Sequence, residues 1–273
     1  MTDSWRLLPY TAHSAGEELA NGVALLNGLA ATGKPALRWY GATEPALVLG
    51  SGQKLSDIDR EACTTAGIRL HRRASGGTAV LFTPGFLMQD IALPVGHRLQ
   101  RGDVTESYHW LGAVWVDALA TLGIAAAAVD VARARTDTQA LDPLVRRACF
   151  GGISPYEVLV GGRKLVGFSQ IRRRAGSLLQ VGIYRRWPGH ELAALLDLPA
   201  VERDLLVERL AARVAGLAEI LPAPPPDDAI MHAFAAALAR IHGITSEPAD
   251  WTAAEREAQI AALPRFAPLA TIA

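Results

Sequence analysis

Cys149 and Lys164 are the residues of this chain best suited to covalent chemistry, and both lie in CFGGISPYEVLVGGRKLVGFSQ (149–170). Only three of the 27 basic residues are lysines, so a lysine is unusual here. A compact ammonium can approach one oxygen end-on, which the planar fork of arginine does not imitate. Arg146 and Arg147 precede Cys149, and nearby cations favour the nucleophilic thiolate. An inert buried cysteine is the competing interpretation, and from sequence alone it is the more common outcome.

Two glycines divide this stretch into a predicted β-hairpin. Gly161 and Gly162 form the two-residue turn that tight hairpins prefer, because both positions need positive φ. Leu159 is then opposite Lys164. Strand alternation places four residues on one face: Lys164, Val166, Phe168 and Gln170. An ammonium on this apolar face is costly to bury unless a negative group meets it. Alternatively, the lysine stem can extend along the hairpin tip to water.

A second glycine-containing stretch, RRASGGTAVLF (72–82), is predicted to run strand, glycine turn, strand. Glycines such as Gly76 and Gly77 let backbone N–H groups approach a ligand closely and present donors to an anion or a carbonyl oxygen. An ordinary β-turn with no ligand accounts for the same residues. The stretch therefore predicts a binding loop only in combination with the hairpin.

The remaining pattern predicts a mixed strand-and-helix protein with a helical end. Apolar spacing and capping residues predict helices over 14–32, 56–67 (with Ser56 as N-cap and Cys63 facing inward), 105–123, 191–198, 201–221 and 228–243, and a short one after 246. Strands are predicted over 36–41, 45–53, 88–95 and 177–187, while the arginine-rich segment up to about 147 is less regular. PAPPPDD (222–228) is predicted to be a linker, which divides the chain into residues 1–221 and a helical extension, 222–273.

Composition excludes several classes of protein. The 273 residues are 50% hydrophobic and 20% charged, as in a folded globular protein. No apolar run reaches the ~18–20 residues of a membrane span, and the N-terminus does not have the layout of a signal peptide. Two distant cysteines argue against a disulfide framework and predict a cytoplasmic location. We therefore expect neither a membrane nor a nucleic acid as partner.

The formal net charge is zero, but residues 131–190 carry an excess of eight positive charges, nearly all of them arginine. One interpretation is a solvated basic face. The other is a surface that attracts an acidic partner or a phosphate group. Nucleic acid is disfavoured because the basic stretch has no repeated aromatic residues for base stacking.

Taken in order, these pieces resemble the lipoate–protein ligase and octanoyltransferase superfamily, which shares its catalytic domain with biotin–protein ligases. The resemblance covers about residues 5–245. It rests on WRLL, ALRWY, LVLGSGQ, RRASGGTAV and GGRKLVGFSQIRRR. It implies an α/β (α+β) fold, a mixed β-sheet packed with helices, followed by the helical C-terminal extension.

The resemblance also implies roles for individual residues. Lys164 is implied to contact the acyl carbonyl, and Cys149, followed by Phe150, matches the nucleophile of the cysteine-dependent transferases. The implied walls of the acyl pocket are Arg72, Arg73, Ser75, Gly76, Gly77, Thr78, Ala79, Gly167, Ser169 and Gln170. An apolar cleft lined by Leu81, Val166 and Phe168 is expected to hold the chain.

Two chemistries occur in this superfamily. Ligases activate free lipoate with ATP, whereas the cysteine-dependent transferases take an octanoyl group from a protein thioester. Here Phe82 and Thr83 stand where the ligase pattern has His-Asp, Thr78 replaces a glycine, and Val181 replaces a later histidine. These departures count against ATP use.

We therefore expect an acyltransferase of protein lipoylation that works through Cys149 and Lys164. Its donor is an acyl carrier or octanoyl-protein, and its acceptor is a lysine of a lipoyl domain. No metal or cofactor is expected, and ATP with Mg²⁺ is needed only if the alternative, an ATP-dependent ligase, holds. A second alternative is an inactive homologue that acts as a binding partner.

Overall fold

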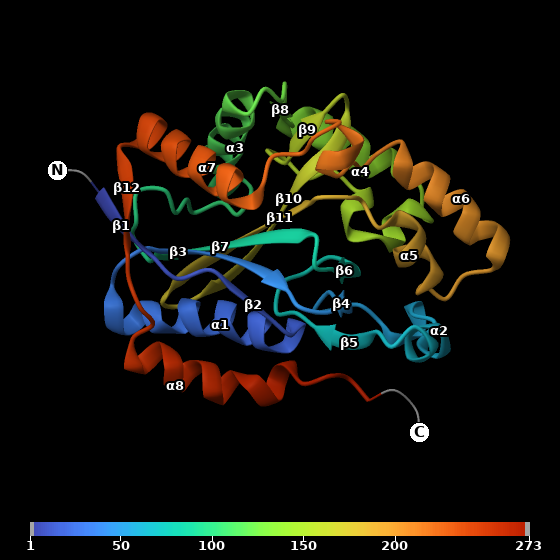
Figure 1. Cartoon of the computed structure of the whole chain (residues 1–273), viewed down its shortest axis with the longest axis horizontal. Coiled ribbons are helices and arrows are strands. Elements are labelled where there is room, and N and C mark those ends of the chain that lie inside the picture. The colour runs from blue at the N-terminus through green and yellow to red at the C-terminus, as the bar shows by residue number, and fades with distance from the viewer. Residues whose placement is uncertain (1–2, 271–273) are drawn as a thin grey trace.

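A computed structural model describes residues 3–270, so residues 1–2 and 271–273, at the outer ends of the two predicted parts, lie outside the description. Within that range a mixed main sheet of nine strands has the order β12-β1-β3-β7-β11-β10-β9-β8, with β2 also paired to β3 (Figure 1). Its strands are β1 Asp3–Leu7, β2 Thr11–His13, β3 Ala36–Ala42, β7 Phe86–Pro94, β8 Ala127–Ala128, β9 Val158–Val160, β10 Arg163–Arg173, β11 Gly176–Tyr184 and β12 Ile244–Pro248. The expected mixed sheet is confirmed.

Helices cover both faces of this sheet. In Figure 1, α1 and α8 lie below it and α3 and α7 lie above it. Their bounds are α1 Ala15–Thr32, α3 His109–Thr121, α7 Asp227–His242 and α8 Ala253–Ala262. The helix predicted over 14–32 is confirmed as α1, which begins at the capping box of Ser14 with Glu17 and ends at Gly33, whose φ is 57°.

A second, smaller sheet lies beside the main one. Its strands, in the order β5-β4-β6, are β5 Arg69–Arg72, β4 Ala46–Leu49 and β6 Val80–Phe82. The nearby helices are α2 Arg60–Thr65, α4 Val131–Ala140, α5 Gly189–Ala194 and α6 Ala200–Ala211. Short 3₁₀ turns complete the elements: η1 Leu55–Asp57, η2 Glu106–Tyr108, η3 Val145–Arg147, η4 Cys149–Gly151, η5 Leu217–Glu219 and η6 Leu263–Phe266. The small sheet carries the 72–82 stretch and the main sheet carries the hairpin.

Several predicted helix boundaries are wrong. The helix predicted over 56–67 is split into η1 and α2, because Asp59 rather than Ser56 caps α2 by accepting from the N–H of Ala62 at 2.9 Å. The helix predicted over 201–221 ends at Ala211. Cys63 does face inward, and it is fully buried.

Several elements were not predicted, namely the short strands β1, β2 and β8, helix α4 and strand β12. Helix α4 lies in the arginine-rich segment, where Ala134 is its one buried residue within the described chain, so the segment has no amphipathic period to detect. Strand β12 lies in the tail, where it runs parallel to β1 at the edge of the sheet. Its five residues, which end in Glu247 and Pro248, are too short and irregular a pattern to indicate a strand, and the pairing with β1 supplies its hydrogen bonds.

The residues after the proline-rich segment pack on the same sheet as the rest of the chain. Phe234 of α7 is fully buried, with its ring centroid 5.6 Å from that of Trp39 and 5.2 Å from that of Trp115. Helix α8 packs against α1, and Arg6 of β1 forms an ion pair with Glu255 of α8 at 2.7 Å. No helix in the described part of the chain has the length and apolarity needed to cross a membrane.

Phe234→Ala is expected to lower the free energy of unfolding by about 3–5 kcal/mol, because the cavity it leaves lies in the core between α7, α3 and the main sheet. Urea denaturation should show one cooperative transition at a lower midpoint. Val201→Ala, at a side chain that is 80% exposed, is the control and should change stability by less than about 0.5 kcal/mol. A separate early transition in Phe234→Ala, with the main one unmoved, would instead mark residues 222–273 as an independent unit.

Candidate active site

The predicted hairpin is present with the predicted register. Gly161 and Gly162 form the turn between β9 and β10, with φ values of 57° and 83°. Lys164 pairs with Leu159 across it. The need for positive φ at both turn positions therefore placed the lysine correctly along the strand.

The face on which the lysine lies was predicted less well. A bulge between Lys164 and Val166 adds a residue to β10 and shifts the alternation locally at Val166. Val166 is consequently buried in the core with residues of α3, and it does not line the cavity beside Lys164. Leu81 does not line it either; Val80 and Phe82 do. Of the three residues expected in the apolar cleft, Phe168 alone is in its wall.

Lys164 is 2% exposed, and its ammonium is paired with a carboxylate. Nζ lies 2.8 Å from Oε2 of Glu157, which also accepts from the N–H of Ser154 at 2.6 Å, while Oε1 accepts from the N–H of Phe168 at 3.0 Å. Three donors on one carboxylate satisfy the requirement for a negative partner. The sequence analysis predicted that a buried Lys164 needs a negative partner, but it did not identify Glu157 as that partner. Glu157 is the one acidic residue in the stretch 149–170.

The backbone before Glu157 is in an unusual conformation. Tyr156 has a φ of 67°, in the left-handed region that non-glycine residues rarely adopt. A Cβ on Gly112 would lie 2.4 Å from the Tyr156 carbonyl oxygen, so α3 packs directly against this turn. Such strain persists where surrounding structure enforces it, and here it aims the Glu157 carboxylate at Lys164.

Cys149 lies at the start of η4, against the loop that follows β5. Its N–H donates to the carbonyl of Ala79 at 3.2 Å, and Nη2 of Arg73 lies 3.4 Å from its Sγ. Arg73 is only 7% exposed, and its guanidinium also donates to the carbonyls of Gly76 and Thr78. A fixed cation facing a sulfur stabilises negative charge on it.

The two arginines that precede Cys149 in sequence are directed elsewhere. Arg146 donates to the carbonyls of Thr138 and Leu141, and Arg147 donates to that of Asp57 at 3.0 Å. The cation that faces the sulfur is therefore Arg73, brought from a distant part of the chain by the small sheet.

The glycines of the 72–82 stretch allow the cysteine to come this close. Gly77 has a φ of 93°, and a Cβ there would lie 3.1 Å from Sγ of Cys149 and 2.7 Å from Nη2 of Arg73. A Cβ on Gly50 would in turn lie 1.8 Å from the carbonyl oxygen of Gly77. The packed backbone explains why glycine is needed at both positions.

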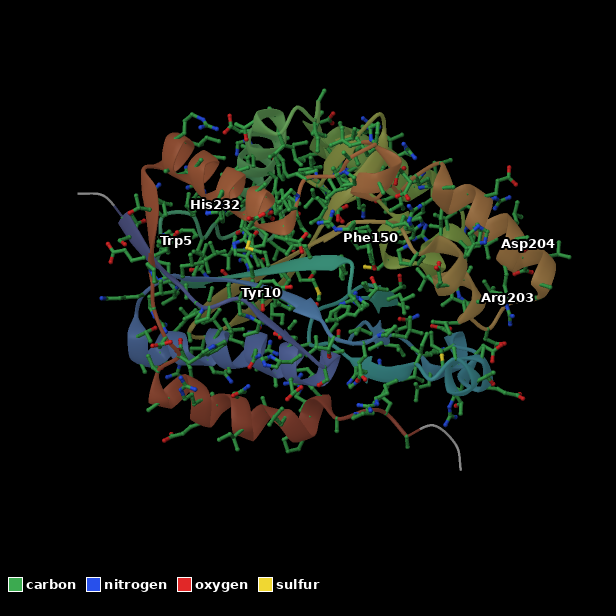
Figure 2. The ribbon with its side chains drawn as sticks, viewed as in Figure 1. Trp5, Tyr10, Phe150, Arg203, Asp204 and His232 are labelled. Carbon is green, nitrogen blue, oxygen red and sulfur yellow. The ribbon has the colours of Figure 1, made fainter. Side chains whose placement is uncertain are left out.

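Two cavities meet at these residues. The inner one is mainly apolar, with walls from Val80, Phe82, Phe86, Met88, Phe150 and Val181. The outer one is more polar, with walls that include Gly76, Gly77, Thr78, Arg146 and Gln170. Both cavities are lined by Cys149, Glu157, Lys164, Phe168 and Ser169. Figure 2 shows Phe150 in the middle of the molecule, and Lys164 Nζ lies 5.4 Å from the centre of its ring.

Some of the other residues predicted to form the pocket wall line a cavity, and the rest hold the surrounding loops in place. Gly167 and Ser169 line the inner cavity together with Arg73. Arg72 lines neither cavity; its guanidinium instead holds the 50–53 turn through the carbonyls of Gly50 and Gln53, at 2.9 Å and 2.6 Å. Ser75 and Ala79 are buried behind the loop.

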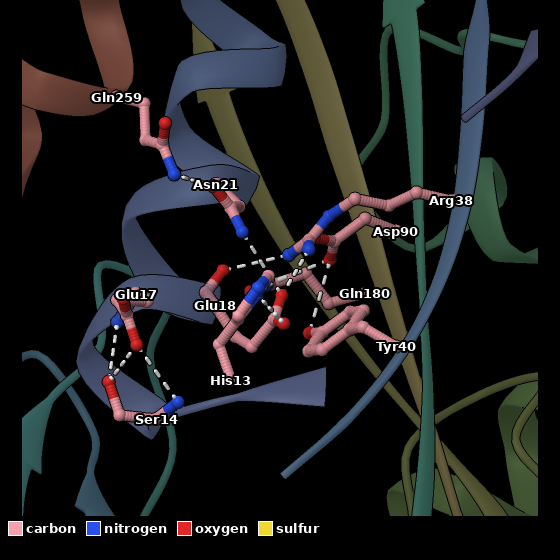
Figure 3. Close-up of polar contacts among 10 residues, drawn as sticks. All are labelled: His13, Ser14, Glu17, Glu18, Asn21, Arg38, Tyr40, Asp90, Gln180 and Gln259. Carbon is pink, nitrogen blue, oxygen red and sulfur yellow. Dashed lines mark hydrogen bonds and ion pairs between the residues drawn. The ribbon is translucent and has the colours of Figure 1, made fainter. Parts of the chain in front are cut away.

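A buried charged network stands behind one wall of the inner cavity (Figure 3). Tyr40 and Gln180 line the cavity, and Gln180 donates to Asp90 at 3.2 Å. Arg38 donates to Asp90 at 2.6 Å and also pairs with Glu18 of α1. Burial raises the pKa of Asp90, and the Arg38 charge opposes that rise. This network gives the cavity a rigid polar boundary.

The chain belongs to the lipoyl protein ligase A/B catalytic domain family, whose sequence model matches residues 14–239. Octanoyltransferase LipM of Symbiobacterium thermophilum is 33% identical over 95% of this chain and 94% of its own length, and that of Kyrpidia tusciae is 33% identical over 93% of each. A bipartite lipoate protein ligase of Thermoplasma acidophilum, from a structural study of the ligase and its E2 lipoyl domain, has the same fold. The two structures superpose with a TM-score of 0.77 over 96% of this chain and 92% of the ligase chain, at 19% sequence identity. The predicted family, fold class and enzyme class, an acyltransferase, are confirmed.

Iodoacetamide at pH 8 is expected to modify Cys149 well before Cys63. Burial, reinforced by the Asp59 carboxylate, raises the pKa of Cys63 to about 11, so its thiol stays protonated until the pH rises above that value. Cys149 is partly exposed and lines both cavities. Peptide mass mapping shows which cysteine is modified first. The Cys149→Ser variant should remain nearly unlabelled, and the Cys63→Ser variant should be labelled like the wild type. Rapid labelling of Cys63 in the folded protein would contradict it.

Glu157→Gln is expected to lower the free energy of unfolding by about 3–5 kcal/mol, because it leaves the Lys164 ammonium buried without a counter-charge. The double variant Glu157→Gln, Lys164→Met removes both charges and should recover most of that loss. Urea denaturation measures all three proteins. Equal stability of the single and double variants would show that Lys164 does not depend on Glu157.

Proposed function

We propose that the protein transfers an octanoyl group to a lysine of a lipoyl domain, through a thioester on Cys149. The observation that carries this proposal is the position of Cys149 and Lys164 at the junction of an apolar and a polar cavity. An acyl chain in the inner cavity brings its carbonyl to the sulfur. The rest of the donor then lies in the outer cavity.

In the first step the Cys149 thiolate attacks the carbonyl carbon of the donor thioester. The bond from that carbon to the donor sulfur breaks, and the departing thiolate takes up a proton. The oxyanion formed on the way is stabilised by the Lys164 ammonium and by backbone N–H groups near Gly76 and Gly77. One such donor contributes about 3–4 kcal/mol in comparable sites.

In the second step the neutral amine of the acceptor lysine attacks the carbonyl of acyl-Cys149. The carbon–nitrogen bond forms, the carbon–sulfur bond breaks, and the Cys149 thiolate is regenerated. The nitrogen loses one proton to solvent, which balances the proton taken up by the donor thiolate in the first step. An amide is more stable than a thioester, so the reaction needs no ATP. Arg73 stabilises the thiolate both before attack and after release.

The apolar wall supports this route over the ATP-dependent ligase, which remains the competing prediction. Phe82 stands where the ligase pattern has a histidine, and its ring packs 5.7 Å from that of Phe86 in the inner cavity. It thus offers no polar group to a nucleotide or its metal. Each methylene of an acyl chain buried there contributes about 0.8 kcal/mol, so chain length is discriminated.

The basic charge supports an acidic acceptor. Arg133 and Arg135 are exposed on α4, and Arg146 lines the outer cavity. Arg146 donates to the carbonyls of Thr138 and Leu141, which ties it to the end of α4, so the positive charges of this helix and of Arg146 are available to a domain that docks at the outer cavity. The T. acidophilum ligase was studied with its E2 lipoyl domain, which supports a lipoyl domain as acceptor here.

Purified protein mixed with an octanoyl-carrier thioester, without ATP, is expected to gain one octanoyl mass on Cys149 and then to octanoylate a lipoyl domain. Intact mass and peptide mapping measure both products, and Cys149→Ser should abolish them. Cys63→Ser is the matched control and should transfer normally. Transfer that requires ATP and free acid would favour the ligase, and no transfer under either condition would favour an inactive binding protein.

A further inference from the structure

Arg213 follows α6 and touches the strand that carries Lys164 through its main chain. The pairing of β10 with β11 begins only at Val166, so the backbone of Lys164 is open on that side. The 213–215 segment fills this gap: the N–H of Lys164 donates to the Arg213 carbonyl at 2.7 Å, and Ala215 N–H donates to the Lys164 carbonyl at 3.0 Å. The lysine is thus tied to the end of α6.

The side chain of Arg213 reaches the loop that carries Cys149. Nε donates to the Gly151 carbonyl at 2.7 Å, and Nη2 donates to Oδ1 and Oδ2 of Asp137 in α4 at 2.5 Å and 2.7 Å. Figure 1 shows α4 and α6 as neighbours at this end of the molecule. One residue therefore joins the lysine strand, the cysteine loop and the arginine-bearing helix.

The cysteine loop is closely packed on this side. Gly151 is buried, and a Cβ there would lie 2.4 Å from the Val145 carbonyl oxygen and 3.1 Å from Cδ2 of Leu210. Its carbonyl needs a donor that fits this tight space and can also satisfy a carboxylate. The planar guanidinium presents Nε and Nη2 in fixed directions, which a lysine ammonium does not.

We propose that Arg213 is a positioning residue for the acyl transfer: it sets the Cys149 loop against the Lys164 strand. Its main-chain bond holds the lysine, and its side chain holds the loop two residues beyond the nucleophile. Because a displacement of about 1 Å at reacting atoms can cost up to about 100-fold in rate, loss of the side chain should be felt in catalysis. The rate part of this inference rests on the proposed function, whereas the geometric part does not.

Arg209 offers a matched control. It lies in the last turn of α6, four residues before Arg213, and forms an ion pair with Asp142, which follows α4, but no hydrogen bond joins it to residues 148–152. Arg209→Gln and Arg213→Gln each remove one cation–carboxylate link between α6 and the 137–142 segment. Only the second change also removes the bond to the Gly151 carbonyl.

Arg213→Gln is expected to slow formation of octanoyl-Cys149 by about 10- to 100-fold, measured with the octanoyl thioester of N-acetylcysteamine. The loss should fall on kcat with KM changed less than about twofold, and Arg213→Lys should restore only part of it. Arg209→Gln should stay within about twofold of the wild type. Hydrogen exchange in the peptide 148–152 should be about tenfold faster in Arg213→Gln and unchanged in Arg209→Gln.

The outcomes separate this inference from the function on which its rate part rests. If the wild type forms no octanoyl-Cys149, the proposed function fails, and hydrogen exchange alone decides the role of Arg213. Equal exchange and equal rates in the two glutamine variants would overturn the inference. So would full rescue by Arg213→Lys, since a point charge would then suffice. If Arg213→Gln does not fold, Asp137→Ala serves as the test variant, because it frees the Arg213 guanidinium from α4. Unchanged kcat together with unchanged hydrogen exchange at 148–152 in Asp137→Ala would also overturn the inference.

Discussion

The buried ion pair between Lys164 and Glu157 is the interaction on which the site depends. An ammonium with 2% exposure is tolerable only if a carboxylate meets it and the carboxylate is itself hydrogen-bonded. Three local features set the position of this pair: the two-glycine turn, the bulge after Lys164, and the left-handed backbone of Tyr156. Together they place the ammonium and its carboxylate in the wall of a cavity.

The cysteine is placed by a different part of the structure. Its loop packs against Gly77 and Arg73, which belong to the loop between β5 and β6 of the small sheet, whereas Lys164 belongs to the main sheet. The site therefore forms where the two sheets meet. The apolar cavity forms at the same junction, because aromatic side chains such as Phe82 and Phe86 fill the space between the sheets without closing it. Cys149 lines this cavity, so its sulfur faces an apolar space partly shielded from water.

Local rules predicted those parts of the molecule that local forces determine. Ser14 caps α1 because its side chain satisfies an N–H in the first turn, and Gly161 and Gly162 turn the hairpin because they accept positive φ. Where a distant partner decides, the same rules failed. The bulge placed Val166 in the core, β12 became a strand because β1 offered an open edge, and α4 is helical with little buried surface. No pattern within a short window carries that information.

Sequence alone determined the family and the mixed fold, and it singled out the two residues, Cys149 and Lys164, that line both cavities, because two glycine-containing motifs and their spacing reflect backbone constraints that few residues meet. The tertiary structure alone decided what surrounds that pair. It showed that Glu157 neutralises Lys164 and that Arg73, rather than the adjacent Arg146 and Arg147, faces the sulfur. Charges act through space over a few ångströms, and folding, not order along the chain, sets those distances.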